Sequence, residues 1–139
     1  MEVARKDQFV MIKLDHGEDI LESIAQTIKE ERSTLLVVTG LGMISDFELG
    51  YFDQGSYIKK TFSDPHELLA LQGSISTEGT SRIHIHATVA NKEHEAFGGH
   101  LMRGRAWMSN EIGMLRLERV ASVRSFDPEK KVGVLHLKK

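Results

Sequence analysis

The sequence contains no cysteine, only two prolines and few aromatic residues, and its apolar runs are short. Without cysteine there are no disulfides, thiolate metal sites or cysteine nucleophiles, so any bound metal must be held by His, Asp or Glu. Apolar runs such as residues 35–38 are far shorter than the ~20 residues that cross a bilayer, and residues 1–9 contain no apolar signal core. These absences predict a cytoplasmic protein.

A large excess of charge is also absent. The formal net charge is −2, with seven histidines counted as neutral. The chain as a whole therefore has no strong electrostatic attraction to the phosphate backbone of DNA. Binding to DNA would need a local basic patch, and the arginines available for one are Arg103, Arg105, Arg116, Arg119 and Arg124.

The proportions of apolar and charged residues, 40% and 27% of 139 residues, are those of an ordinary globular protein. One hydrophobic core suits this length, because two cores would each be undersized. We therefore expect a single domain over residues 1–139.

Hydrophobic periodicity indicates one helix among many short strands. Apolar residues recur at helical spacing over residues 18–32. A turn is expected at Gly40-Leu41-Gly42. Alternating or β-branched patterns predict strands at residues 8–14, 34–39, 45–52, 57–62, 67–76, 82–90, 105–120 and 132–137. This pattern predicts an α+β fold, with a mostly antiparallel β-sheet packed against one main amphipathic helix.

The strand predicted over residues 82–90 carries a pair of histidines. Strict alternation places the side chains of His84 and His86 on one face of this strand and the apolar side chains on the other. Residues two apart on a strand are separated by roughly 6 to 7 Å, so both imidazoles can converge on one metal at bonds of about 2.0 to 2.1 Å. The spacing alone also fits two polar residues on a half-exposed face without any ligand.

A third histidine, His100, follows Gly98-Gly99 ten residues after the strand. A simple reversal of the chain would bring it to the same point as His84 and His86. Three neutral imidazoles with a fourth position open to water are a ligand set found in catalytic zinc sites. The glycines have a second explanation, since they permit positive φ and close backbone approach at any turn.

Two short motifs are similar to nucleotide- or DNA-binding sequences but lack essential parts. Gly40-Leu41-Gly42 follows a strand as a dinucleotide-binding loop does, but the third glycine is missing and no helix follows. Arg103-Gly104-Arg105 is similar to the core of an AT-hook, which lies in the minor groove, but Ala106 stands where proline is expected. We expect neither motif to bind nucleotide or DNA.

Several motifs in the same order make the chain resemble the plant and prokaryote conserved (PPC) domain family, in its stand-alone prokaryotic branch. The family also includes the domain attached to AT-hooks in plant nuclear proteins. The resemblance covers nearly the whole chain. It rests on Gly17-Glu18-Asp19, Gly40-Leu41-Gly42, residues 67–73, His84-Ile85-His86-Ala87, and Gly98-Gly99-His100-Leu101 with Gly104.

The resemblance implies an antiparallel sheet with a packed helix, and assembly as a homotrimer. In the plant branch, the positions that match His84, His86 and His100 are generally not histidine, so the fold does not require imidazoles there. Minor-groove contact in plants belongs to the AT-hook, which this chain lacks.

Two functional hypotheses follow. The first is a homotrimeric metal-binding module, an enzyme or not, in which His84, His86 and His100 hold Zn²⁺ or another divalent metal. The alternative is a DNA-binding or protein-interaction module that acts through the trimer surface. Because imidazole must be neutral to bind metal and its ordinary pKa is about 6.5, the first hypothesis predicts metal loss between about pH 7 and pH 5.

Overall fold

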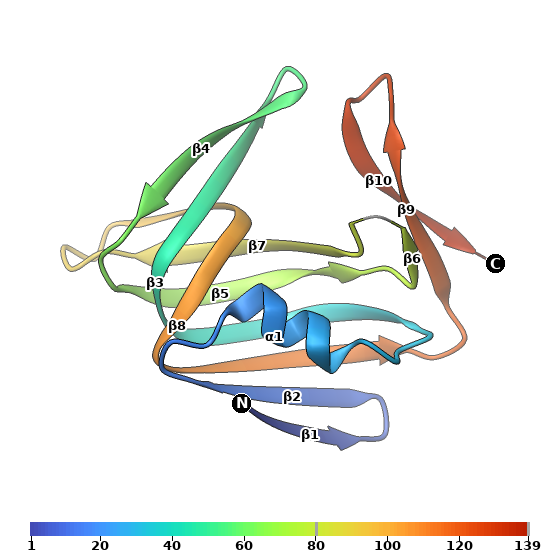
Figure 1. Ribbon diagram of the computed structural model, residues 1–139, viewed down its shortest axis with the longest axis horizontal. Coiled ribbons are helices and arrows are strands. Elements are labelled where there is room, and N and C mark those ends of the chain that lie inside the picture. Colours follow the sequence, from blue (N-terminus) through green and yellow to red (C-terminus); the bar gives the residue numbers. More distant parts are fainter. Residues whose placement is uncertain (80, 139) are drawn as a thin grey trace.

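The computed structural model describes residues 1–79 and 81–138. Figure 1 shows the long strands and the single short helix of this part of the chain. In chain order the elements are β1 (Glu2–Lys6), β2 (Phe9–Asp15), α1 (Ile20–Thr27), β3 (Thr34–Asp53), β4 (Ser56–Phe62), β5 (His66–Ile75), β6 (Glu78–Gly79), β7 (Ile83–Ala90), β8 (Ala96–Leu117), β9 (Ala121–Asp127) and β10 (Val132–Lys138).

The larger sheet has the strand order β1-β2-β8-β7-β5-β3-β4, with all pairs antiparallel. The long strand β8 pairs with β7 and also with β3, so the circuit β3-β5-β7-β8 closes on itself. A second, three-stranded sheet has the order β10-β9-β6 and contains a parallel pair, β6 with β9. The predicted mostly antiparallel sheet is confirmed.

The helix is shorter than the sequence predicted. It was expected over residues 18–32, but α1 covers eight residues, Ile20–Thr27. Asp19 caps its start, where its carboxylate accepts a hydrogen bond from the Glu22 N–H at 2.9 Å. Beyond Ile28 the sequence is charged over residues 29–32, so a longer helix would have had no apolar side to bury. The helix is thus a small cover on a β-structure and not a main packing element.

Alternation along β2 fixes which face of the sheet meets the core. Val10, Ile12 and Leu14 are buried, whereas Phe9 and Met11 are exposed. The buried side chains join Ile20 and Ile24 of α1 in one hydrophobic cluster with those of the closed circuit of strands. Since burial of apolar surface is the main favourable term in folding, this cluster holds the sheet and α1 together.

The predicted turn at Gly40-Leu41-Gly42 is wrong. These residues lie inside β3, a strand of 20 residues whose register with β8 shifts just before and just after them. A Cβ at Gly40 would overlap the side chain of Leu71 on the neighbouring strand β5. Here glycine therefore serves close packing between strands, which a single sequence does not distinguish from a turn.

A row of cross-strand partners connects the outer face of the sheet to the histidine pair. Phe9 lies opposite Leu115, Leu115 opposite Leu36, Leu36 opposite Ser74, and Ser74 opposite His84. Directly opposed residues share a face, so His84 projects from the same side as the exposed Phe9 and away from the buried core. The candidate site is therefore a feature of the outer surface.

We predict that Gly73→Ala destabilises the protein by about 1 to 3 kcal/mol, the usual cost of overpacking. A Cβ at Gly73 would overlap the carbonyl oxygen of His84, which lies on the paired strand β7. Backbone cannot move aside as a flexible side chain does. Urea unfolding of the purified variant measures the loss.

Gly133→Ala is the matched control, because its Cβ would lie 3.4 Å from Cγ of Arg124, an ordinary contact. We expect this variant to keep the stability of the parent protein. Equal stability of the Gly73 and Gly133 variants would contradict the close approach of β5 to β7.

Candidate metal centre

The alternation predicted for the histidine strand is confirmed in β7. Ile85, Ala87 and Val89 are buried in the core. His84 is half-buried and His86 is exposed, on the opposite face of the strand. The apolar residues thus anchor the strand, and the two imidazoles are left free to meet a ligand.

His100 reaches the same place by strand pairing. It lies in β8 directly opposite His86, in the antiparallel register that also pairs Gly98 with Thr88. The reversal expected between the two motifs is therefore a hairpin, formed by the end of β7 and the start of β8. Strand geometry brings together residues that are fourteen positions apart in the sequence.

The three imidazoles form a compact cluster. Ring centroids lie 5.0 Å apart for His84 and His86, 5.0 Å for His84 and His100, and 5.5 Å for His86 and His100. One ring nitrogen from each lies within 4.8 Å of the other two. Among the described residues this is the group of His, Asp or Glu side chains whose positions suit one ion.

The closest pair of nitrogens already has the spacing of two metal ligands. Nε2 of His86 lies 3.2 Å from Nε2 of His84. Two nitrogens bonded to one tetrahedral zinc at 2.0 to 2.1 Å are separated by about 3.3 Å. The donor atom of His100 lies within 4.8 Å of these two nitrogens, so an inward movement of the imidazoles would complete a set of three ligands for one divalent ion.

His100 contributes a second sign of an incomplete site. Its Nδ1 is buried and has no hydrogen-bond partner among residues 1–79 and 81–138. Its ring lies 5.1 Å from that of Tyr57, at a tilt of 34°. Buried polar atoms without a partner are uncommon, and in the described part of the chain Asn110 and Arg124 also carry such atoms.

Burial and neighbouring charge lower the pKa of two of the three imidazoles, His84 and His100. Burial lowers the pKa of His84 to about 4, with smaller effects in the same direction from Arg124 and the other two imidazoles. Burial also lowers the pKa of His100, again helped by His86 and Arg124. Neutral imidazole is the form that donates a lone pair to a metal, so these two side chains are ready to bind at neutral pH.

The other histidines do not join the cluster. His66 packs against Phe47, Phe62 and Phe97, with centroid distances of 5.1 to 5.6 Å. His16 lies beside Trp107 and accepts a hydrogen bond from the Met108 N–H. In the sequence, too, neither histidine has another histidine at the spacing of metal ligands.

The positions of the arginines argue against the basic patch considered for DNA binding. Arg124 is buried, at 7% exposure, and Arg116 pairs with Glu31 at 2.6 Å. Arg103-Gly104-Arg105 lies inside β8, paired with β3. An AT-hook is a flexible segment, so this triplet is a strand and not a hook.

Two residues of the site were not identified from sequence patterns. Tyr57 of β4 and Arg124 of β9 line one cavity together with His84 and His100. Both come from strands that are distant in the sequence, and no motif marked either of them. Only the folding of β4 and β9 toward β7 brings them to the histidines.

Comparison with known proteins agrees with this architecture. The family model of the Plants and Prokaryotes Conserved (PCC) domain, abbreviated PPC above, matches residues 1–118. The chain belongs to this family. The resemblance seen in the sequence motifs is thus confirmed, whereas residues 119–139 lie beyond the part that the PPC family model matches.

Solved structures of related chains share the fold. A metal-containing protein from Archaeoglobus fulgidus is 28% identical, with a TM-score of 0.81 over 96% of this chain and 94% of that one. A "putative DNA-binding protein" from Ralstonia eutropha is 24% identical, with a TM-score of 0.85 over 98% and 96%. At the lower identity the likeness concerns the PPC fold alone.

A curated relative is much longer. The bifunctional protein GlmU of a Synechococcus strain is 30% identical over 95 residues, which is 67% of this chain. The chain spans only 14% of the length of that protein. Among the residues described for this PPC protein, no helix has the length and apolar character needed to span a bilayer.

We predict that the metal-free protein loses stability as the pH falls from about 6.5 toward 4. An unfolded chain protonates His84 near pH 6.5, whereas the folded chain resists until about pH 4, so the unfolded state binds more protons in this window. Urea unfolding at pH 7, 6 and 5, with chelator present, measures the slope.

His84→Gln removes this titrating group and should flatten the slope between pH 7 and pH 5. The flattening is partial, because His100 is shifted in the same direction. Parallel slopes for the parent protein and the variant would show that His84 is not held neutral by the fold.

Proposed function

We propose that this protein is a small homotrimeric PPC-domain protein, a single domain over residues 1–139, that binds a divalent metal. His84, His86 and His100 are the ligands, and Zn²⁺ or a similar ion is the metal. Three protein ligands leave a further coordination position for water or an exchangeable ligand.

The observation that carries this proposal is the separation of 3.2 Å between Nε2 of His84 and Nε2 of His86. Without metal the two nitrogens share a hydrogen bond at this distance, and the same spacing lets both lone pairs turn to one ion. The metal-containing relative from Archaeoglobus fulgidus, at 28% identity, gives independent support.

A zinc ion held in this way would lower the pKa of a bound water to about 7 and act as a Lewis acid. The protein side chains would hold it on the outer face of the sheet. Tyr57 and Arg124 would border the open side, since both line the same cavity as His84 and His100.

We predict that protein purified without a His-tag and dialysed against Zn²⁺ retains one metal ion per chain. His84→Ala and His86→Ala should each weaken Zn²⁺ binding by at least about tenfold, because each removes one of three ligands from an open site. Elemental analysis gives the stoichiometry, and competition with a chromogenic chelator gives the affinity.

His136→Ala is the matched control, since His136 is an exposed histidine of β10 outside the cluster. It should bind Zn²⁺ as the parent protein does. Substoichiometric metal in the parent protein, or equal Zn²⁺ affinity of the His84 and His136 variants, would contradict the proposed site.

The pH range of metal loss should lie lower than the sequence alone suggested. Unperturbed imidazoles predicted loss between pH 7 and pH 5. Because the pKa of His84 is about 4 and that of His100 is also lowered, protons compete with the metal for these two ligands only in more acidic solution. Retention of metal at pH 5 is therefore compatible with histidine ligands.

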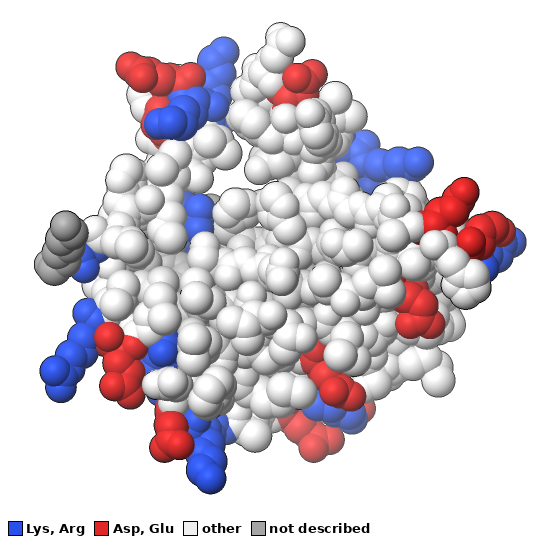
Figure 2. Space-filling view, turned by 180° about the vertical axis from the view of Figure 1, so that it is seen from behind, with Lys and Arg blue, Asp and Glu red and all other residues white. Residues whose placement is uncertain are grey.

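The homotrimer rests on the family resemblance and on the outer surface of the sheet. Figure 2 shows that charged side chains lie mainly around the edge of the face seen from behind α1, while its centre is uncharged. The outer row contains the exposed Phe9, and Met11 and Leu41 are exposed as well. Apolar surface of this kind favours association.

We predict a mass of three chains by light scattering at micromolar concentration. Phe9→Glu should lower this mass, because a carboxylate would be placed in the contact between copies. Leu137→Glu is the control, since Leu137 is equally apolar and 63% exposed on β10. A monomer mass for the parent protein would overturn the trimer.

The DNA-binding alternative has less support from the charges. Two of its five arginines are engaged elsewhere, Arg124 by burial and Arg116 by Glu31. The name of the Ralstonia relative mentions DNA binding, but at 24% identity the likeness extends only to the fold. We therefore place metal binding first.

A further inference from the structure

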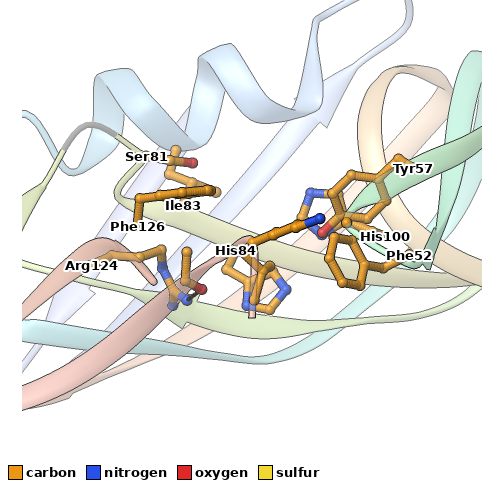
Figure 3. A pocket seen from close by; sticks show the side chains of 12 residues that line it. Phe52, Tyr57, Ser81, Ile83, His84, His100, Arg124 and Phe126 are labelled. Carbon is orange, nitrogen blue, oxygen red and sulfur yellow. Dashed lines mark hydrogen bonds between the residues drawn. The ribbon is translucent and has the colours of Figure 1, made fainter. Parts of the chain in front are cut away.

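A cavity of about 250 Å³ lies between the histidine strands and the C-terminal hairpin of β9 and β10. Figure 3 shows Arg124 and Phe126 at one end, His84 between, and Tyr57, His100 and Phe52 at the other end. The hairpin follows residue 118, where the match to the family model ends. The cavity therefore combines the family's sheet with a wall from outside the matched segment.

Arg124 is a buried cation without a counter-ion. Its exposure is 7%, and no carboxylate forms an ion pair with it in the described part of the chain. One Nη donates to Oγ of Ser74 at 2.8 Å, and the other reaches the carbonyl of Gly133 at 3.5 Å. Nε has no partner. Arginine is almost never buried in this way unless something pairs with it.

The cavity wall is electropositive although the whole chain is slightly acidic. Of the described residues, Arg124 and Lys131 are the charged ones that line it, and no Asp or Glu among them does so. The net charge of the chain is −2. Burial lowers the pKa of Arg124, which reflects the cost of holding this charge without an anion. A local surplus of positive charge in a concave site favours a negatively charged ligand.

Beside the two cations, Ser81 and the two histidines, the lining is mainly apolar or aromatic. Phe52 and Tyr57 come from β3 and β4, Ile83 from β7, and Phe126 and Val132 from the hairpin. Walls of this type bind a hydrocarbon or aromatic body, and a few polar groups then fix its orientation. A free inorganic anion would leave these walls without a contact.

We propose that this cavity binds a small organic carboxylate, with its anionic head on the guanidinium of Arg124 and its apolar body against the aromatic wall. Each Nη of Arg124 carries two N–H groups, and the contacts to Ser74 and Gly133 use one on each, so the planar guanidinium keeps donors in the two-point geometry that matches a carboxylate. The inference does not depend on the metal, because Arg124 and the apolar walls are complete without it.

Benzoate is the probe and benzamide its uncharged control of the same shape. Both are titrated into metal-free protein, with chelator present, while the Nε–H signal of Arg124 is followed by NMR. We expect benzoate to shift this signal and to bind at least about tenfold more tightly than benzamide, the value of one charge-assisted hydrogen bond. Equal binding of the two, or no binding of benzoate, would overturn the proposal.

Arg124→Gln should weaken benzoate binding by about tenfold or more, and Arg124→Lys by less, since lysine keeps the charge but not the fork. Arg103→Gln, at an exposed arginine of β8, should leave it unchanged. Circular dichroism checks that the variants fold. If they do not, the comparison of benzoate with benzamide on the parent protein still tests the proposal. Unchanged affinity in a folded Arg124→Gln variant would contradict the inference.

A Zn²⁺ titration of the same samples separates this proposal from the metal site. Benzoate binding without Zn²⁺ binding would support the carboxylate cavity and contradict the metal centre. Zn²⁺ binding without benzoate binding to the metal-free protein would support the metal centre and contradict the carboxylate cavity.

Discussion

The antiparallel register between β7 and β8 is the constraint on which the site depends. It sets His100 opposite His86, and the two-residue period of β7 puts His84 on the same face. The buried Ile85, Ala87 and Val89 hold this register, because a slip of one residue would expose them and bury the imidazoles. The hydrophobic core thus specifies the geometry of a polar surface cluster.

Local patterns in the sequence predicted local structure well. Alternation identified the faces of β2 and β7, and the histidine pair was found by the same rule. The end of the helix and the course of β3 were missed for physical reasons: a charged run after Ile28 offers nothing to bury, and Gly40 serves strand packing instead of a turn. The sequence around Arg124 suggests only a surface charge, since nothing local reveals that the hairpin buries it.

The charge of Arg124 affects both the proposed metal ion and the proposed carboxylate. Its charge helps to keep His84 and His100 unprotonated, and the same charge opposes a divalent cation held by them. A carboxylate bound between the guanidinium and the metal would offset this repulsion. The C-terminal hairpin, outside the matched family segment, would in this way adapt the histidine cluster of a PPC protein to an anionic ligand.

The central claim is that three imidazoles from two paired strands hold one metal ion. Crystals of the protein grown with Zn²⁺ and measured on both sides of the zinc absorption edge test it most directly. The account predicts one anomalous peak per chain, about 2.0 to 2.1 Å from a ring nitrogen of each of His84, His86 and His100. A peak held by other side chains, or no peak at the cluster, would contradict it.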